Sequence, residues 1–375
     1  MNSSSWRKRA LGLAVVGWGA AVLSAYYLVH PPWVAGNLWP ASDMLRPFGA
    51  RHDGWLNAFE QLGLTLAGWI GTLILTHTLG RWLAPFLSGY PPRERFALQI
   101  GLGFGALGLI MLALGFIRLP SPALAWIVVI GTLPFGARPF LAGLRGALPR
   151  WSANNANRAL ATFLAVTLSL IFLRALAPIT AWDSLVYHLT GPKLYLEAGR
   201  IHHDVDLMHL GLPQWGSMLF LWGMLIASPQ LAQLIHFTFA LLTLALALGV
   251  TNRIAPGRGW LAAAICLSVP TAALLAGWAY VEWMTMYCGL AAFVCFTAEI
   301  AESAEKEKRN SAVNLSLAAM AGVFTGLAFA AKYTAVGLAL GLAALAMVWL
   351  RSGKGRLVFF LAAVLIVAPY LIKNA

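Results

Sequence analysis

One short segment of this 375-residue chain concentrates side chains that could act on a substrate. Residues 179–206 read ITAWDSLVYHLTGPKLYLEAGRIHHDVD and bring acidic, histidine and basic side chains close together, although charged residues make up only 10% of the chain. A carboxylate can accept the proton of a hydroxyl group and so turn that group into a nucleophile. Asp183 is the first acidic residue of the segment, and Tyr187 follows it by one helical turn. This segment is therefore the first candidate for a catalytic loop.

The same region could instead bind a metal ion. Imidazole and carboxylate groups suit Zn²⁺ or Mn²⁺, and such groups recur at His202, His203, Asp204, Asp206 and His209. Their spacing matches no known metal site, and solvated loop charges are the commoner reason for such a cluster. The sequence therefore predicts no certain cofactor and leaves a divalent metal as an open alternative.

The remainder of the chain must hold this segment beside a membrane. Hydrophobic residues make up 60% of the sequence, which is more apolar surface than a soluble domain can bury. The apolar runs are long and uninterrupted, as in transmembrane helices, and lack the alternating pattern of barrel strands. The net charge of +13 is scattered in short clusters between these runs, which indicates topology signals and no nucleic-acid-binding face. The predicted fold class is an all-α, polytopic membrane helix bundle.

Apolar windows long enough to cross a bilayer predict about eleven transmembrane helices. A further apolar run at 212–228 is short, and we expect it to be a helix embedded from the outer surface. The first four windows define an N-terminal four-helix region, residues 1–158, and the others a core, residues 159–375. The eleven windows lie near 11–29, 62–80, 96–117, 121–137, 159–178, 231–250, 259–278, 283–300, 312–330, 334–350 and 356–372.

Charged residues predict which ends of these helices face the cytoplasm. If the N-terminus is inside and 212–228 does not cross, most of the 26 Lys and Arg residues fall on the cytoplasmic side. The first apolar run is then expected to be an uncleaved crossing and not a signal peptide. Most carboxylates, including Asp183 and Glu282, fall on the opposite, outer face.

The first large outer loop is predicted to form two short interfacial helices. Trp182, Leu185, Val186 and Leu189 recur at helical spacing as an apolar stripe that could lie on the membrane. Pro192 suits the start of a second helix, and Gly199 suits its end. Asp183 would lie near the start of the first helix, where capping the helix is an alternative to catalysis.

Three motifs resemble one enzyme superfamily. They are WDSLVYHLTGPKLYLEAGRI at 182–201, AGWAYVEW at 276–283 and GLAFAAKYTA at 326–335. Together they resemble the GT-C superfamily of polyprenyl-phosphate-sugar-dependent integral-membrane glycosyltransferases, which includes dolichyl-phosphate-mannose protein mannosyltransferases and lipid A aminoarabinose transferases. The resemblance covers roughly residues 159–375, and the first four spans carry no motif that we can assign.

This resemblance implies a function and roles for particular residues. The chain would move a sugar from a polyprenyl-phosphate donor to a lipid, glycan or protein acceptor by an inverting single displacement. Asp183 matches the catalytic carboxylate, and Lys332 matches a lysine that approaches the lipid phosphate. Glu282 stands where the family usually has an aspartate, which puts its role as a second carboxylate in doubt. The expected location is the cell envelope, in a bacterial inner (plasma) membrane with the active site facing outside.

Three more residues are candidates for substrate binding, each with a structural alternative. His188 could orient Asp183 or contact the donor phosphate, or it could simply pack. Tyr187 could stack on a sugar, or lie at the membrane interface as aromatic residues often do. Arg174, near the outer end of its span, could pair with a carboxylate or a phosphate. Lys332 itself could be a lysine that only extends toward the headgroups from a helix end.

Two other classes of protein share part of this pattern. A polytopic transporter of a small solute or lipid-linked substrate also has many helices and a few charges within the membrane, although transporters usually place those charges near the midplane. A non-catalytic membrane scaffold would not require the charged groups to converge. The chain ends soon after a span that family members normally continue with further helices, so we expect a truncated C-terminus.

Overall fold

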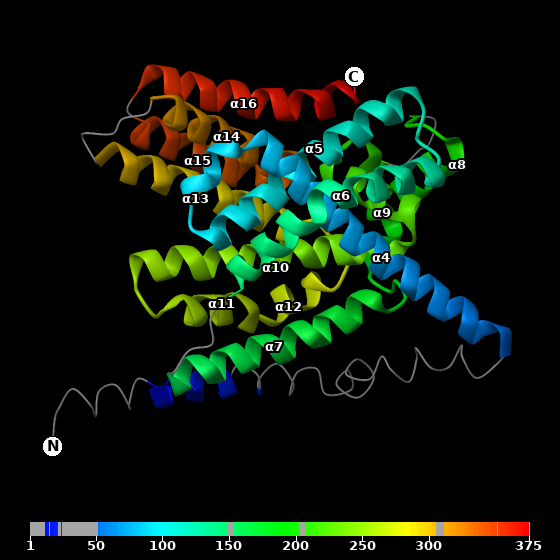
Figure 1. Ribbon diagram of the computed structural model, residues 1–375, viewed down its shortest axis with the longest axis horizontal. Coiled ribbons are helices and arrows are strands. Elements are labelled where there is room, and N and C mark those ends of the chain that lie inside the picture. Colours follow the sequence, from blue (N-terminus) through cyan, green and yellow to red (C-terminus); the bar gives the residue numbers. More distant parts are fainter. Residues whose placement is uncertain are drawn as a thin grey trace. The chain divides into compact units, whose positions relative to one another are not determined.

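The chain is described here by a computed structural model (Figure 1). It divides into two compact units, residues 1–58 and residues 59–375. This division falls at residue 58, and the boundary predicted at residue 158 stays a prediction. The candidate site lies in the second unit. The structure describes residues 12–14, 16–21, 24, 52–148, 154–202, 208–304, 311–350 and 352–374.

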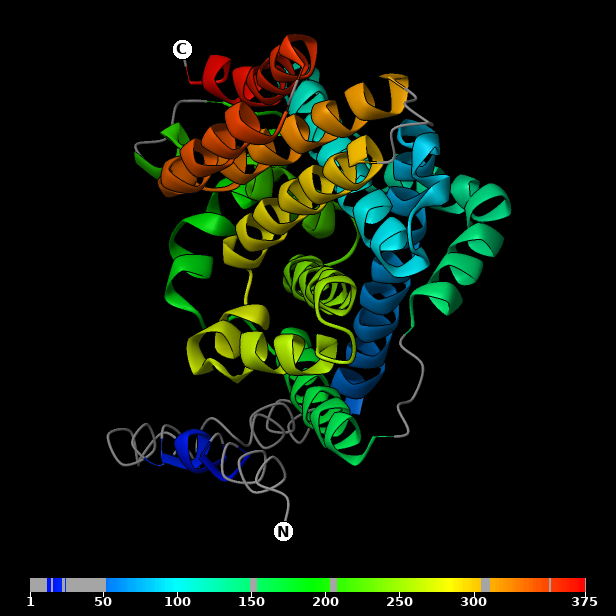
Figure 2. The same cartoon turned by 90° about the vertical axis from the view of Figure 1, so that its left-hand side faces the viewer.

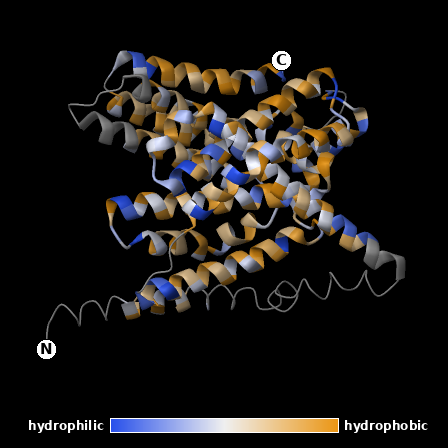
Figure 3. Ribbon diagram, viewed as in Figure 1, coloured by the Kyte–Doolittle hydropathy of each residue, from blue (hydrophilic) through white to orange (hydrophobic). Residues whose placement is uncertain are grey.

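Helices provide all the regular secondary structure of the described residues, as the apolar runs predicted. Figure 3 shows that hydrophobic residues dominate long helices such as α7 and α16 along most of their length. In chain order the helices are α4 (His52–Leu83), η2 (Pro85–Gly89), α5 (Pro92–Ile117), α6 (Pro122–Ala147), α7 (Asn155–Leu176), η3 (Ser184–His188), α8 (Thr190–Ala198), η4 (Met208–Gly211), α9 (Trp215–Ile226), α10 (Pro229–Ile254), α11 (Gly259–Ser268), α12 (Pro270–Ala276), α13 (Glu282–Ala304), α14 (Ser311–Ala331), η5 (Tyr333–Ala335), α15 (Val336–Trp349) and α16 (Gly353–Ile372).

Six of the described helices are long and apolar enough to cross a membrane, and a bent pair could provide a seventh crossing. The helical membrane bundle is therefore confirmed in outline, whereas the count of eleven crossings is not. One reason is that some apolar windows form shorter helices than their length suggested. For example, α15 has 14 residues and so extends about 21 Å, against a hydrocarbon core of about 30 Å.

The window at 259–278 does not form one straight helix. It is split into α11 and α12, which meet at an angle of 85°. Pro270 explains the break, because a proline cannot donate its backbone nitrogen and disfavours helical geometry in the residue before it. Val269 accordingly adopts an extended conformation, with φ −72° and ψ 114°. The bend delivers the chain to the link that precedes Glu282.

Helix α9 confirms that the 212–228 run contains a short helix. Its 12 residues extend about 18 Å, which is too short to cross a bilayer. Trp222 donates its indole N–H to Thr72 Oγ1 at 3.0 Å, which ties α9 to α4. The turn to α10 is capped by Ser228, whose Oγ accepts the backbone N–H of Leu231. Helix α9 thus packs inside the bundle.

Helix α10 occupies the middle of the second unit, as Figures 1 and 2 show from two directions. Most of its side chains are buried, including Gln233 and His236. The observed burial shows that this apolar helix is surrounded by protein for most of its length. Its buried polar residues, such as Gln233 and His236, therefore face neighbouring parts of the protein.

Glycines let α4 and α5 approach closely. A Cβ atom added at Gly103 would lie 1.8 Å from the backbone oxygen of Thr76, and one added at Gly80 would lie 1.7 Å from that of Gln99. Small residues are favoured at helix contacts in membranes, because lipid is as apolar as the helices and close packing must hold them together.

Two sets of contacts define the two ends of the bundle. At one end, Arg253 on α10 pairs with Glu94 on α5 at 3.2 Å. At the other end, the backbone N–H of Ile201 donates to the carbonyl of Gly115 at 2.7 Å, and Lys373 Nζ donates to the carbonyl of Leu210 at 2.6 Å. Residues 177–202 and 208–214 and the links that precede α13 and α15 lie at this second end.

We predict that Gly103→Ala will destabilise the protein, because the added methyl group must push α4 and α5 apart. Overpacking of this kind costs about 1–3 kcal/mol, and the apparent melting temperature in detergent should fall. The matched control is Gly131→Ala, since a Cβ at Gly131 meets no atom within 4 Å. Alanine is the better helix former by about 1 kcal/mol, so this control should be neutral or stabilising. Equal melting temperatures for both variants would contradict the proposed close contact.

Candidate functional site

The candidate loop begins at a fixed helix end. Gln233, buried on α10, donates its side-chain amide to the carbonyls of Ala175 and Ala177, at 3.0 Å each. These carbonyls belong to the last turn of α7 and would otherwise lack partners. The chain that leaves α7 toward Asp183 therefore starts from a defined position.

The two short helices predicted for this loop are present. The first is a π-helical turn, η3, and the second is α8, which ends at Gly199 with φ 68°. The left-handed conformation of Gly199 is the helix stop that the sequence predicted. The predicted apolar stripe is only partly correct, because Trp182 is 77% exposed whereas Leu189 is buried.

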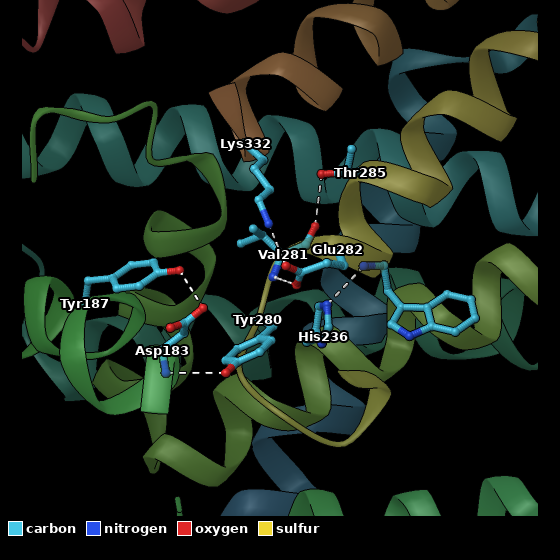
Figure 4. Close-up of polar contacts among 9 residues, drawn as sticks. Asp183, Tyr187, His236, Tyr280, Val281, Glu282, Thr285 and Lys332 are labelled. Atoms are coloured by element: carbon cyan, nitrogen blue, oxygen red, sulfur yellow. Dashed lines mark hydrogen bonds and ion pairs between the residues drawn. The ribbon is translucent and has the colours of Figure 1, made fainter. Parts of the chain in front are cut away.

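Asp183 does not cap a helix with its side chain. Its Oδ2 instead accepts the hydroxyl hydrogen of Tyr187 at 2.9 Å, and its backbone N–H donates to the hydroxyl oxygen of Tyr280 at 3.3 Å (Figure 4). The pairing of residues 183 and 187 follows from helical spacing. Tyr280 comes from the link between α12 and α13, and nothing in the local sequence indicated its contact with Asp183.

The link that carries Tyr280 also supports the neighbouring turn. Ser184, which is fully buried, donates its hydroxyl to the carbonyl of Ala279 at 3.2 Å. Two successive residues of the loop thus bond to two successive residues of the link. This double contact orients the Asp183 side chain relative to Glu282, which begins α13.

Glu282 and Lys332 form an ion pair that sequence reasoning did not predict. Lys332 Nζ lies 2.7 Å from Glu282 Oε1, and the two side chains are 36% and 27% exposed. The second carboxylate oxygen of Glu282, Oε2, accepts the backbone N–H of Val281 at 3.1 Å. Both oxygens of Glu282 are therefore engaged, and the pair joins the start of α13 to the end of α14.

The negative charges of Asp183 and Glu282 both influence the hydroxyl groups of Tyr187 and Tyr280. Burial raises the pKa of the Tyr187 hydroxyl, and its hydrogen bond to Asp183 and the negative charges of Asp183 and Glu282 raise this pKa further. Burial also raises the pKa of Tyr280, and the negative charges of Asp183 and Glu282 raise it further. Figure 4 shows both carboxylates beside Tyr280. Three predicted residues, Asp183, Glu282 and Lys332, thus occupy one end of the bundle.

Aromatic and histidine side chains cover this group. The ring of Tyr187 stacks on His209 of η4, with centroids 4.3 Å apart and planes 6° apart. His188 is buried and packs against Tyr187 at 4.2 Å and Tyr280 at 5.6 Å. Burial lowers the pKa of His188 to about 3, so the imidazole is neutral near pH 7. A neutral His188 offers packing and hydrogen bonding to a phosphate, but no positive charge.

His236 is a further residue that sequence reasoning did not assign to the site. It is fully buried on α10, and its Nε2 accepts the backbone N–H of Trp283 at 3.2 Å. Trp283 directly follows Glu282 in the first turn of α13, where backbone N–H groups lack helical partners. His236 therefore helps to hold the helix start that carries Glu282.

Arg174 lies at the same end of the bundle but makes different contacts. Its guanidinium carbon lies 5.5 Å from the centroid of the Trp278 ring, and one of its nitrogens donates to Thr180 Oγ1 at 3.3 Å. Within the described structure it forms no ion pair with either carboxylate of the site. Of the predicted site residues, Arg174 alone stands apart from the others.

The metal alternative gains no support from the residues that can be assessed. Among them, no group of three His, Cys, Asp or Glu side chains could hold an ion. His202 packs edge-on against Tyr195, with centroids 6.0 Å apart. His203, Asp204 and Asp206 lie outside the described residues.

A cavity of about 350 Å³ lies among α14, α15 and α16. Two of its lining residues, Val364 and Leu371, are 62% and 50% exposed, so the cavity opens on the surface of the bundle. Phe329, another lining residue, precedes Lys332 by three positions. The lining consists of Thr325, Gly326, Phe329, Ala339, Ala363, Val364, Val367, Ala368 and Leu371.

Comparison of this chain with family models, curated proteins and solved structures finds no match. The resemblance to the GT-C superfamily therefore stays a prediction from the three sequence motifs. The geometry of the site must carry any functional proposal.

We predict that Glu282 and Lys332 stabilise the protein only as a pair. Glu282→Gln and Lys332→Met should each lower stability, because each leaves a partly buried charge without its partner. The double variant should recover part of the loss, with a coupling energy of about 1–3 kcal/mol in a double-mutant cycle. Unfolding in mixed micelles with increasing denaturing detergent would measure this coupling.

The matched control is the pair Lys193 and Glu197 on α8, which are 3.8 Å apart and 66% and 59% exposed. Exposed pairs one helical turn apart contribute about 0.5 kcal/mol or less. A coupling for residues 282 and 332 no larger than for this control pair would contradict a structural role for the ion pair.

Proposed function

We propose that this protein is a membrane glycosyltransferase that moves a sugar from a polyprenyl-phosphate donor to an acceptor hydroxyl group. The observation that carries the proposal is the convergence of Asp183, Glu282 and Lys332 at one end of an apolar helix bundle. The two carboxylates differ in that Asp183 accepts a hydrogen bond at one oxygen and Glu282 at both. Such a site can meet a substrate that remains anchored in the lipid.

The proposed reaction is a single displacement at the anomeric carbon of the sugar. The acceptor oxygen forms a bond to this carbon while its proton passes to the Asp183 carboxylate. The bond between the anomeric carbon and the phosphate oxygen breaks, and the phosphate leaves with the electron pair. Attack from the face opposite to the leaving group inverts the configuration of the sugar.

Asp183 is better suited than Glu282 to act as the base. One oxygen of Asp183 accepts a hydrogen bond from Tyr187, and its Oδ1 accepts none from the residues that the structure describes. Both oxygens of Glu282 are already bonded, to Lys332 and to the backbone of Val281. We therefore assign the proton transfer to Asp183, and to Glu282 the task of positioning Lys332.

Lys332 is the proposed partner of the leaving phosphate. An ammonium group has three N–H donors, and the described contacts use one of them, toward Glu282. The other two could stabilise negative charge as it develops on the phosphate. The apolar cavity that Phe329 helps to line is suited to a hydrocarbon chain, which supports a lipid-linked donor.

The proposal places this end of the bundle at the outer face of a bacterial inner membrane. About eleven crossings with the N-terminus inside remain our proposed topology. In support, Arg253 lies at the end opposite to Asp183, as the distribution of basic residues requires. The acceptor class, whether lipid, glycan or protein, stays open in this proposal.

We predict that Asp183→Asn will lower sugar transfer by about 10²–10⁴-fold, which is the range for loss of a general base. The measurement is transfer of labelled sugar in membranes supplied with a polyprenyl-phosphate sugar. Asparagine keeps the size and the hydrogen-bond acceptor of aspartate, so membrane insertion and melting temperature should remain unchanged. Tyr187→Phe should reduce transfer less, because it removes only the hydrogen bond that orients Asp183.

The control for this experiment is Glu197→Gln, which removes an exposed carboxylate from α8 in the same loop. It should leave transfer unchanged. Full transfer by Asp183→Asn would exclude Asp183 as the base. Loss of transfer in Glu197→Gln as well would show that the loss reflects the charge of the loop in general.

A transporter is the second candidate function, and the bent pair of α11 and α12 is the observation that favours it. Transporters often bind their substrates where helices are broken. Uptake or flipping of a lipid-linked substrate by reconstituted protein, without chemical change of that substrate, would support this candidate. The position of Asp183, Glu282 and Lys332 at one bundle end, away from the midplane, favours the transferase.

A further inference from the structure

Arg174 differs from Lys332, the other predicted cation at this end of the bundle, in having no acidic partner among the described residues. Lys332 is already paired with a carboxylate at 2.7 Å. Arg174, by contrast, has no carboxylate within ion-pair distance in the described part of the chain, and its one side-chain hydrogen bond, to Thr180, is 3.3 Å long. A guanidinium offers five N–H donors in a planar fork. Most of the hydrogen-bonding capacity of Arg174 is therefore unused.

The position of Arg174 is fixed by its surroundings. The last turn of α7 is held by Gln233, whose amide occupies the carbonyls of Ala175 and Ala177. Those carbonyls therefore do not compete for the guanidinium. On the other side, Gly277 leaves room for the Arg174 stem, since a Cβ there would lie 2.9 Å from Arg174 Cγ.

Trp278 provides a platform beneath the guanidinium. A cation within about 6 Å of an aromatic centroid is attracted to the ring face, and the distance here is 5.5 Å. Beyond this contact, the guanidinium makes one hydrogen bond with the described residues, to Thr180. A lysine or arginine that only reached for water would extend away from the protein. Arg174 is instead held against Trp278.

A second donor beside Arg174 also lacks an acceptor. The indole nitrogen of Trp278 is buried and has no hydrogen-bond partner in the described structure. An unpaired buried donor costs about 1–3 kcal/mol. Trp278 thus carries a second N–H donor without an acceptor on the ring that supports Arg174.

We propose that Arg174, supported by Trp278 and Thr180, binds the phosphate group of a lipid headgroup at a site separate from the Glu282–Lys332 pair. A phosphate matches the fork of the guanidinium and carries the opposite charge. Arg174 lies in the last turn of α7, which is long and apolar enough to cross a membrane, and the ends of such a helix lie near the headgroups. This inference does not rest on the transferase function.

Binding to the full-length protein in a nonionic detergent tests the proposal. The probe is short-chain dioctanoyl phosphatidic acid, with phosphate-free dioctanoylglycerol as its control, and titration calorimetry gives the affinity. We expect the wild-type protein to bind the first lipid and not the second. Arg174→Gln should weaken binding by at least tenfold, and Arg174→Lys by less, because lysine keeps the charge but loses the fork.

The matched control is Arg118→Gln, which removes an exposed arginine at the same end of the bundle. It should leave the affinity unchanged. Equal weakening by Arg118→Gln would overturn the proposal by showing general charge attraction, as would full binding by Arg174→Gln. Loss of binding in Lys332→Met but not in Arg174→Gln would overturn it by assigning the phosphate to Lys332. A melting temperature measured for each variant excludes unfolding as the cause.

Inorganic phosphate distinguishes the two sources of the ligand. Weaker binding of free phosphate than of phosphatidic acid supports a lipid headgroup. Equal affinities support the phosphate site but assign it to a soluble phosphate, and binding of neither overturns it. Asp183→Asn should bind phosphatidic acid normally while it loses sugar transfer. If the wild type shows Arg174-dependent binding without any transfer, the phosphate site stands and the transferase proposal fails.

Discussion

A partly buried charge is stabilised by a partner of opposite charge, and the arrangement of the site follows from this constraint. Glu282 and Lys332 are 50 positions apart in the sequence, and their ion pair joins the beginning of α13 to the end of α14. Moving either charge away from the other would leave it partly buried without its partner. The link before α13 is thereby fixed, and with it Ala279 and Tyr280. These two residues receive the hydrogen bonds of Ser184 and Asp183.

The rest of the bundle is held by short-range contacts. Hydrophobic burial does little to choose between helix neighbours in a membrane, because lipid tails are as apolar as the side chains. Close approach at Gly80 and Gly103 therefore sets the distance between α4 and α5. Hydrogen bonds such as that from Trp222 to Thr72 add direction. At the opposite end of the bundle, the ion pair of Glu94 with Arg253 joins α5 to α10, as the pair of Glu282 with Lys332 joins α13 to α14 at the end that holds Asp183.

Local sequence patterns could predict the parts of this structure that depend on neighbours in the chain. The apolar runs predict helices, Gly199 predicts the end of α8, and spacing predicts the contact of Tyr187 with Asp183. The break at Pro270 lies inside a continuous apolar run, which concealed it from a reading based on hydrophobicity. The contacts of Tyr280, Gln233 and His236 join segments far apart in sequence. Helix periodicity cannot indicate them, because it does not say which helices pack together.

The distribution of charge explains why two cations at one bundle end should have different roles. Asp183 and Glu282 carry two negative charges, and Lys332 balances one of them, while His188 stays neutral because it is buried. The group therefore keeps an excess negative charge, which opposes the approach of a phosphate to Lys332 unless a substrate supplies compensating contacts. Arg174 lies outside this group, on the ring of Trp278, and forms no ion pair with a carboxylate of the described residues. A phosphate near Arg174 would therefore meet a cation with no carboxylate of the described residues in ion-pair distance, whereas one near Lys332 would meet a cation that Glu282 partly neutralises.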